Sequence, residues 1–449
     1  MPGVSQAVPE VPGGRRPVVA HVNYHFFHST QSFIYFSLSH LRRTQPICLT
    51  RAPESRAIRR TVPAPFADDF YLYRGQSGGR LSAAAGAIGH AARSGLSRLP
   101  PTLADPLLRG LFESIVPRVR RDARPAHFLD WAEAILRARD AELIHAYFGP
   151  IGWRMLALKE RLGLPLVVTF LGDDVAPALG PWWSWWIADG AQAPDWPARL
   201  HELLARADLL LVEGPHLRER VIALGCDPAK VDVQRIALPL GDFSPAAPRT
   251  RPSERAVIVF AGRFCAQKGV LYALEAVRLL RRKRRDFELR LLGDETLTDG
   301  RYAASVYAFV RRHRLGDHVR FLGFRNHREC VASMREADVF LHPSIVDDEG
   351  LSEGGAPTTI IEAQALAIPV VSTWHCDIPN VTVPGESALL VPERDAPALA
   401  DALRELLDDP ARRQAMGRAG RRHVERLHDA RRETPRLEDH YLRLLASPE

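Results

Sequence analysis

The chain contains 449 residues, of which 46% are apolar and 25% charged, and its formal net charge at pH 7 is +7. This length predicts two or three globular domains, and no run approaches the about 20 uninterrupted apolar residues that a membrane-spanning helix needs. The five cysteines are scattered without metal-site spacing, which suits a reducing cytoplasm. Residues 1–17 are rich in proline and glycine, which predicts a disordered tail and no secretory signal.

The positive charge is compatible with anionic substrates and with anionic membrane surfaces. The sequence contains no recognised nucleic-acid-binding motif and no stripe of aromatic residues among the basic ones, so we predict no nucleic-acid partner. The histidines and cysteines form no cluster with metal-ligand spacing. We therefore predict a protein without a metal site and without a cofactor.

The first half of the chain, residues 18–240, predicts a parallel α/β domain. An apolar strand at residues 18–22 is followed by a polar loop, a helical segment and a second strand, which is the pattern of a βαβ unit. Residues 74–124 have no strand signal and predict a helical insert. Nine arginines against three acidic residues give this insert a net charge of +6. A solvated helical face and a membrane-surface helix both explain it, and the two interpretations stay open.

The strand–helix alternation resumes after the insert, and a buried strand at residues 164–170 ends in the segment LGDD, residues 171–174. Ligands of open α/β sheets bind outside the carboxyl ends of the strands, so this strand end is a candidate site. Residues 181–190 contain four tryptophans. They indicate either a local cluster under a loop or a surface for lipid or sugar.

Residues 239–255 contain four prolines and no periodic pattern, which marks a linker between domains. The second domain, residues 256–425, restarts with a buried strand that runs into Gly262 and Arg263, and Lys268 precedes the next helix. Strands alternate with helices from there on, as a second doubly wound sheet requires.

The stretch from Leu341 to Asn380 predicts a strand, an acidic glycine-rich loop, a helix and a second buried strand. Pro357 is predicted in the first helical turn, where its missing N–H is tolerated. The amides of residues 358–360 should then be unpaired at a helix N-terminus, which favours an anion. Gly354 and Gly355 would let the backbone approach a ligand closely.

Two carboxylates flank this predicted anion site, Glu353 before it and Glu362 inside the helix. A carboxylate does not bind a phosphate group, so we infer that the pair holds neutral hydroxyl groups on either side of one. A ribose, a diphosphate and a hexose in a row describe a nucleotide sugar.

At this loop the sequence resembles the retaining glycosyltransferases of family 4, which have the GT-B fold. Their donor site carries two glutamates separated by seven residues, and the string EGGAPTTIIE at residues 353–362 places eight between them. The segment HCDIP, residues 375–379, resembles the branch that builds colanic acid and other exopolysaccharides. The resemblance covers about residues 18–445. It implies two Rossmann-like doubly wound domains that face each other across a cleft, with a C-terminal helix at residues 426–449 returning to the first domain.

The resemblance also implies roles for individual residues. Arg263 and Lys268, in the string GRFCAQKG, would stabilise a leaving diphosphate, Glu353 would contact the transferred sugar, and Glu362 would bind the ribose. The family carries a histidine where this chain has Leu171. The implied catalytic residues are Arg263, Lys268 and Glu353, the donor-binding residues are Gly262, Gly323, Gly354, Gly355, Thr358, Thr359 and Glu362, and the acceptor-side residues are Thr30, Gly172 and Asp174.

We therefore predict a metal-independent retaining glycosyltransferase of exopolysaccharide biosynthesis. Its partners would be a nucleotide-sugar donor, which is a substrate and not a cofactor, and a lipid-linked or other saccharide acceptor. The predicted location is the cytoplasm, with peripheral contact to the anionic inner face of the plasma membrane left open. Two alternatives also stay open, namely a nucleotide-sugar epimerase or hydrolase of the same fold and a non-catalytic subunit of a polysaccharide assembly complex.

Overall fold

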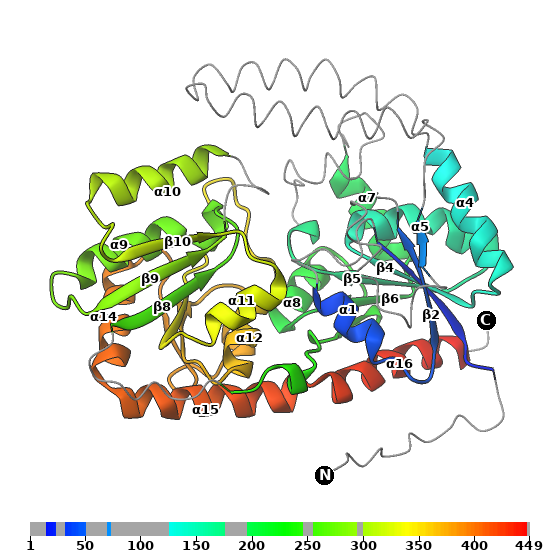
Figure 1. Ribbon diagram of the computed structural model, residues 1–449. Coiled ribbons are helices and arrows are strands. Elements are labelled where there is room, and N and C mark those ends of the chain that lie inside the picture. The colour runs from blue at the N-terminus through cyan, green and yellow to red at the C-terminus, as the bar shows by residue number, and fades with distance from the viewer. Residues whose placement is uncertain are drawn as a thin grey trace, which may run out of the picture.

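Figure 1 shows the computed structural model, which describes residues 15–23, 32–50, 70–72, 125–175, 195–245, 255–293 and 300–446. The predicted insert at residues 74–124, the tryptophan segment at residues 181–190 and Thr30 lie outside the described residues. Most of the predicted tail and part of the predicted linker also lie outside them, so these statements remain predictions. In the ranges that are described, no helix is long and apolar enough to cross a membrane.

The first sheet has seven parallel strands in the order β3-β2-β1-β4-β5-β6-β7. The chain builds outward from β1 to β3 and then returns to the other side of β1, so the strand order reverses between β1 and β4. The strands are β1 (Val18–Val22), β2 (Gln45–Thr50), β3 (Phe70–Leu72), β4 (Leu143–Tyr147), β5 (Leu166–Phe170), β6 (Leu209–Val212) and β7 (Val231–Val233), and the described helices are α1 (Ser32–Ser39), α4 (Pro125–Ala138), α5 (Gly149–Leu162), α7 (Trp196–Arg206) and α8 (Pro215–Ala223).

The second sheet has six parallel strands in the order β10-β9-β8-β11-β12-β13 and reverses between β8 and β11. Two doubly wound parallel sheets confirm the predicted α/β class. The strands are β8 (Ala256–Ala261), β9 (Phe287–Leu292), β10 (Val319–Gly323), β11 (Val339–His342), β12 (Val370–Thr373) and β13 (Ala388–Val391), and the helices are α9 (Val270–Leu280), α10 (Gly300–Arg312), α11 (His327–Met334), α12 (Thr358–Ala365), α13 (Ile378–Val381) and α14 (Ala396–Asp408).

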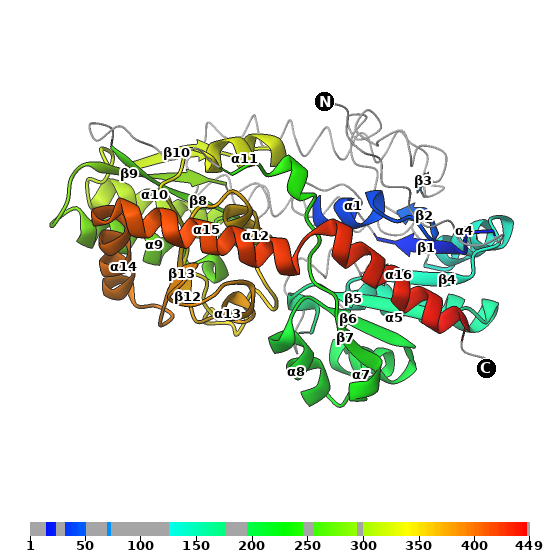
Figure 2. The ribbon, with the colours of Figure 1, turned by 90° about the horizontal axis from the view of Figure 1, so that it is seen from below.

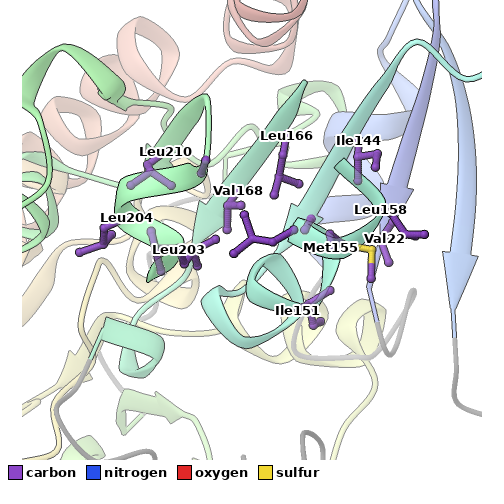
Figure 3. Close-up of a cluster of buried hydrophobic side chains, with 14 of the residues drawn as sticks. Val22, Ile144, Ile151, Met155, Leu158, Leu166, Val168, Leu203, Leu204 and Leu210 are labelled. Atoms are coloured by element: carbon purple, nitrogen blue, oxygen red, sulfur yellow. The ribbon is translucent and has the colours of Figure 1, made fainter. Parts of the chain in front are cut away.

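Continuous apolar runs explain why these segments form parallel sheets. Every residue of β1, β4, β5 and β8 is buried, as a sheet covered by helices on both faces requires. On one face of the first sheet, Ile151, Met155 and Leu158 of α5 lie against Ile144 of β4 and Val168 of β5 (Figure 3). This packing leaves the polar loops at the strand ends, where ligands of such sheets bind.

The last two helices, α15 (Pro410–Leu427) and α16 (Ala430–Ala446), join the two halves of the molecule from outside. Figure 2 shows α15 along the second half and α16 along the first. Accordingly, α15 packs on α12 and α16 packs on α1. Between the two helices, the amide of Leu238 donates to the His428 carbonyl at 2.7 Å, and the Leu238 carbonyl accepts from the Ala430 amide at 2.9 Å.

One buried carboxylate anchors α16 to the first half. The side chain of Glu438 is 1% exposed, and its Oε1 accepts from the amides of Arg42, Arg43 and Thr44 at 2.9, 2.6 and 2.9 Å. The hydroxyl of Thr44 adds a fourth donor at 3.1 Å. The turn between α1 and β2 is therefore held by a side chain from the last helix.

We expect Glu438→Ala to lower the free energy of unfolding by at least about 2 kcal/mol, because it leaves three backbone amides without an acceptor. Chemical denaturation measures this loss. Glu425→Ala on α15 is the control, since Glu425 is half exposed and pairs with Arg421 across one helical turn. Its loss should stay within about 0.5 kcal/mol, and equal losses in the two variants would contradict the anchoring role.

Candidate active site

Lys268 and Glu353 form an ion pair at the carboxyl edge of the second sheet. Lys268 Nζ lies 2.6 Å from Glu353 Oε2, with 15% and 10% of the two side chains exposed. Lys268 ends a short 3-10 helix after β8, and the next residue, Gly269, has a φ of 66°. A Cβ on Gly269 would overlap the Pro343 carbonyl. This close approach brings the loop after β8 against the loop after β11.

The other carboxylate oxygen of Glu353 is also held. Ser344 Oγ donates to Oε1 at 2.9 Å, and His342 Nε2 lies 3.4 Å from it. Burial alone would raise the pKa of Glu353, but the Lys268 ammonium and the His342 ring hold that pKa well below its usual range. Glu353 is therefore an oriented carboxylate with a cation beside it.

A histidine also fixes the backbone at Glu353. The amide of Glu353 donates to His375 Nε2 at 3.1 Å, and the opposite ring nitrogen of His375 lies 2.7 Å from Glu393 Oε1. His375 is buried, and the Glu393 carboxylate sets the tautomer in which Nε2 accepts. The donor loop, by which we mean residues 352–357, is thus tied to the ends of β12 and β13.

Arg263 lies in the same part of the site as Lys268. Burial raises the pKa of the Cys265 thiol, while the charges of Arg263 and Lys268 both act to lower it, so both cations act electrostatically on one side chain. Gly262 donates its amide to the Leu292 carbonyl at 2.9 Å. The loops after β8 and β9 therefore meet beside the cations.

The predicted donor-binding residue Gly323 ends β10 at the same edge of the sheet. Its φ is 69°, and its carbonyl accepts from the amide of Gly293 at 3.0 Å. Gly293 has a φ of 137°, and a Cβ on it would overlap the Gly262 carbonyl. The structure thus brings the two predicted positions Gly262 and Gly323 together through Gly293, which was not predicted.

Glu362 lies inside α12, and its side chain is 3% exposed. It pairs with His327, whose Nε2 lies 2.8 Å from Glu362 Oε1. Burial alone would lower the pKa of His327, but the hydrogen bond and the charge of Glu362 raise it. Sequence reasoning did not find His327. Its only signal was its place four residues after the predicted donor-binding residue Gly323, as the first residue of α11.

The start of α12 differs from the prediction in one respect. The helix begins at Thr358, and Pro357 is the N-cap residue with a ψ of 117°, so Pro357 does not lie in the first turn. The amide of Ile360 donates to the Pro357 carbonyl at 3.0 Å, so the prediction that this amide is unpaired is wrong. Thr358 and Thr359 remain the first two residues of the helix, at the positive end of its dipole.

Two of the three predicted acceptor-side residues, Gly172 and Asp174, lie directly after β5. Gly172 has a φ of 123°, and a Cβ on it would overlap the Glu353 carbonyl, so the first half touches the donor loop through backbone atoms. Asp174 is fully buried. It accepts from the amides of Gly149 at 2.8 Å and Leu171 at 3.2 Å, and so it holds the end of β5 to the start of α5.

Contacts between the two halves continue at the end of β6. Glu213 Oε2 accepts from the Ala356 amide at 3.3 Å. Asp377, which precedes α13, accepts from the His216 and Leu217 amides at 2.9 and 3.2 Å and so caps the N-terminus of α8 from the other half of the molecule. Figure 2 shows α8 facing α13. We call these contacts, with the one at Gly172, the interdomain seam.

Sequence reasoning missed Glu213 and Asp377. Glu213 directly follows a buried strand, which is the same signal that identified Gly172. Asp377 belongs to the segment HCDIP that carries the resemblance to the exopolysaccharide branch, but that resemblance gave it no role. For metal binding, the described part of the chain brings together no group of three or more His, Cys, Asp or Glu side chains suited to hold an ion.

Comparison with solved structures defines the class of fold. The chain superposes on HepE from Anabaena, solved with UDP and glucose, with a TM-score of 0.68 over 94% of this chain and 98% of that one, at 13% identity. Sucrose-phosphate synthase from Thermosynechococcus elongatus gives a TM-score of 0.67 over 96% of this chain and 100% of that one, at 19% identity. Two doubly wound sheets arranged in this way constitute the GT-B fold.

Sequence comparisons give the family. The family described as glycosyl transferases group 1 matches residues 246–423, and the glycosyl transferase 4-like domain matches residues 80–236. D-inositol 3-phosphate glycosyltransferase from Kineococcus radiotolerans is 32% identical over 65% of this chain and 69% of its own length. The chain belongs to the group 1 glycosyltransferases.

Two relatives are named for polysaccharides. The putative colanic acid biosynthesis glycosyltransferase WcaL from Salmonella typhimurium is 31% identical over 59% of this chain. The amylovoran biosynthesis glycosyltransferase AmsK from Erwinia amylovora is 32% identical over 60% of this chain. The match spans 61% of the length of each of these relatives.

We expect Gly354→Ala to disrupt the interdomain seam. Gly354 has a φ of 73°, and a Cβ on it would overlap the backbone of Gly172. Gly350→Ala is a matched control, because Gly350 has a φ of 80° but no atom within 4 Å of a Cβ. Both variants lose the freedom of glycine, and only Gly354→Ala adds the overlap, which should cost about 1–3 kcal/mol more in unfolding free energy. Equal melting temperatures for the two variants would show that the seam does not constrain this loop.

Proposed function

We propose that this chain is a retaining glycosyltransferase that transfers a sugar from a nucleotide-sugar donor to a lipid-linked saccharide during exopolysaccharide biosynthesis. The observation that carries the proposal is the ion pair of Lys268 and Glu353 at the carboxyl edge of the second sheet. It combines a cation that can neutralise a diphosphate with a carboxylate that can accept hydrogen bonds from sugar hydroxyls.

In the proposed reaction, the bond between the anomeric carbon and the diphosphate oxygen breaks while the acceptor oxygen attacks from the same face of the sugar. The acceptor proton passes to the departing phosphate. Arg263 and Lys268 stabilise the negative charge that develops on the leaving group, which a fixed cation does without reorganisation. Glu353, held by Ser344 and the amide–His375 contact, orients the sugar.

The ribose would bind at the other end of the donor site. Glu362 is buried in α12, and its partner His327 lies after the loop that follows β10. A carboxylate oxygen paired with a histidine retains lone pairs that accept from ribose hydroxyls. In this proposal Gly323 lies by the base, Glu362 binds the ribose, the α12 N-terminus faces the diphosphate, and Glu353 contacts the hexose.

The relatives support the substrate class. WcaL and AmsK are named for colanic acid and amylovoran biosynthesis, and HepE was solved with UDP and with UDP-glucose. A relative from Corynebacterium glutamicum, 31% identical over 44% of this chain, is named as GDP-mannose-dependent. UDP-glucose and GDP-mannose are therefore the first donors to test.

The test is turnover of these two donors by the purified protein with and without a lipid extract that contains saccharide acceptors. Acceptor-dependent release of the nucleoside diphosphate, with a product that keeps the anomeric configuration of the donor, supports the proposal. Donor consumption without an acceptor would instead indicate an epimerase or hydrolase. An inverted product would contradict the retaining mechanism.

Arg263→Ala and Lys268→Ala should each reduce turnover at least tenfold, because removal of one charge-stabilising donor raises the barrier by about 2.7–4 kcal/mol. Steady-state kinetics with the active donor measure this. Lys283→Ala is the control, since Lys283 is an exposed lysine paired with Asp401 on the surface. Near-normal rates in both site variants would eliminate the diphosphate role.

We also expect turnover to be unchanged by EDTA, because two protein cations take the place that a divalent ion would fill beside the diphosphate. The measurement compares rates after chelation and after addition of magnesium or manganese. Activity that disappears with EDTA and returns with either ion would show that the leaving group needs a metal.

A further inference from the structure

One carboxyl group from the first half of the molecule reaches into the donor loop of the second half. Glu213 is 6% exposed, and its Oε2 lies 3.3 Å from the amide nitrogen of Ala356. A Cβ on the neighbouring Gly355 would overlap the same oxygen. The absence of a side chain at Gly355 thus lets Glu213 lie directly on the backbone of the loop that carries Glu353.

The surroundings of Glu213 are acidic. Asp174 from the loop after β5, Glu353 from the donor loop and Asp377 from the start of α13 all act on it electrostatically. Two basic groups of this region have partners other than Glu213. Lys268 pairs with Glu353, and Arg220 of α8 lies 3.4 Å from the Ser352 hydroxyl.

Two histidines, His216 of α8 and His375 after β12, are the next titratable groups of this region. The backbone amide of His216 donates to Asp377 at the start of α8. Burial lowers the pKa of the His216 ring, and the charge of Asp377 opposes that effect. His375 after β12 faces the Glu353 amide. In the described part of the chain, the hydrogen-bond partner of Glu213 is the Ala356 amide and neither of these histidine rings.

We propose that Glu213 is a positioning residue of the donor site, which holds the Gly355–Ala356 backbone so that Glu353 meets the transferred sugar in the correct orientation. This inference rests on the proposed function. It extends the site to the first half of the molecule, and it makes the geometry of Glu353 depend on the closed arrangement of the interdomain seam.

The protonation state of Glu213 supports this role. Burial raises its pKa to about 8, with Asp377 adding to the shift. Because the pKa is raised, Glu213 keeps its proton in the folded protein up to a pH of about 8. The stabilisation that the protonated carboxyl group gives to the folded loop is lost as the pH rises through that value. Below this limit the neutral acid accepts from the Ala356 amide without repelling three nearby carboxylates.

The experiment measures binding of UDP-glucose and GDP-mannose, and of UDP and GDP alone, by calorimetry between pH 6 and 9. Glu213→Ala should weaken binding of the active nucleotide sugar at least tenfold and change binding of the nucleotide alone less than twofold, because Ala356 and Glu353 lie at the sugar end. Glu213→Gln, whose amide oxygen can accept from Ala356, should bind as the wild type does at pH 7. Glu219→Gln, an exposed change on α8, is the matched control.

The pH series separates positioning from a purely structural role. Wild-type binding of the nucleotide sugar should weaken above pH 8, and Glu213→Gln should not show that loss. Superimposable pH profiles for these two proteins, or an equal loss for nucleotide and nucleotide sugar in Glu213→Ala, would overturn the positioning role alone. A wild-type protein that binds none of the four probes would overturn the proposed function, and this inference with it.

Discussion

The ion pair of Lys268 and Glu353 is the interaction on which the rest of the site depends. Two charges so little exposed would be costly to bury alone, because desolvation opposes the attraction between them. The loops offset this cost with donors to the second carboxylate oxygen, Ser344 and the His342 ring. The result is a charged pair with a fixed direction, which is what stabilisation of a developing charge requires.

Both halves of the molecule determine the orientation of this pair, because residues of the first half contact the loop that carries Glu353. Gly172 lies on the Glu353 carbonyl, and the Glu213 side chain lies on Gly355 and Ala356 of the same loop. Such approaches between backbones are open only to glycine, since any Cβ would fill the space. The donor loop is therefore shaped from one side by the second sheet and from the other by the strand ends of the first.

Helix caps and long helices hold the two halves in this arrangement. Asp377 accepts hydrogen bonds from two amides at the start of α8. The N-cap residue of that helix is Gly214, which has no side chain to accept them. Helix α15 packs on the second half and α16 packs on the first. There Glu438 accepts hydrogen bonds from three amides of the turn between α1 and β2. The seam and the C-terminal helices thus both constrain the relative placement of the two halves.

The amino-acid sequence by itself determined the α/β class and the two sheets, and it predicted a site made of Arg263, Lys268 and the two glutamates. These follow from local patterns, because buried parallel strands are continuous apolar runs and a donor loop needs glycines and charges within a few residues of one another. Only the tertiary structure decided that Lys268 pairs with Glu353, that His327 faces Glu362, and that Glu213 and Asp377 join the halves. The residues of the last two contacts are separated by 143 and 161 positions. No local pattern encodes such a contact, because it arises only when two independently formed sheets present their strand ends to each other.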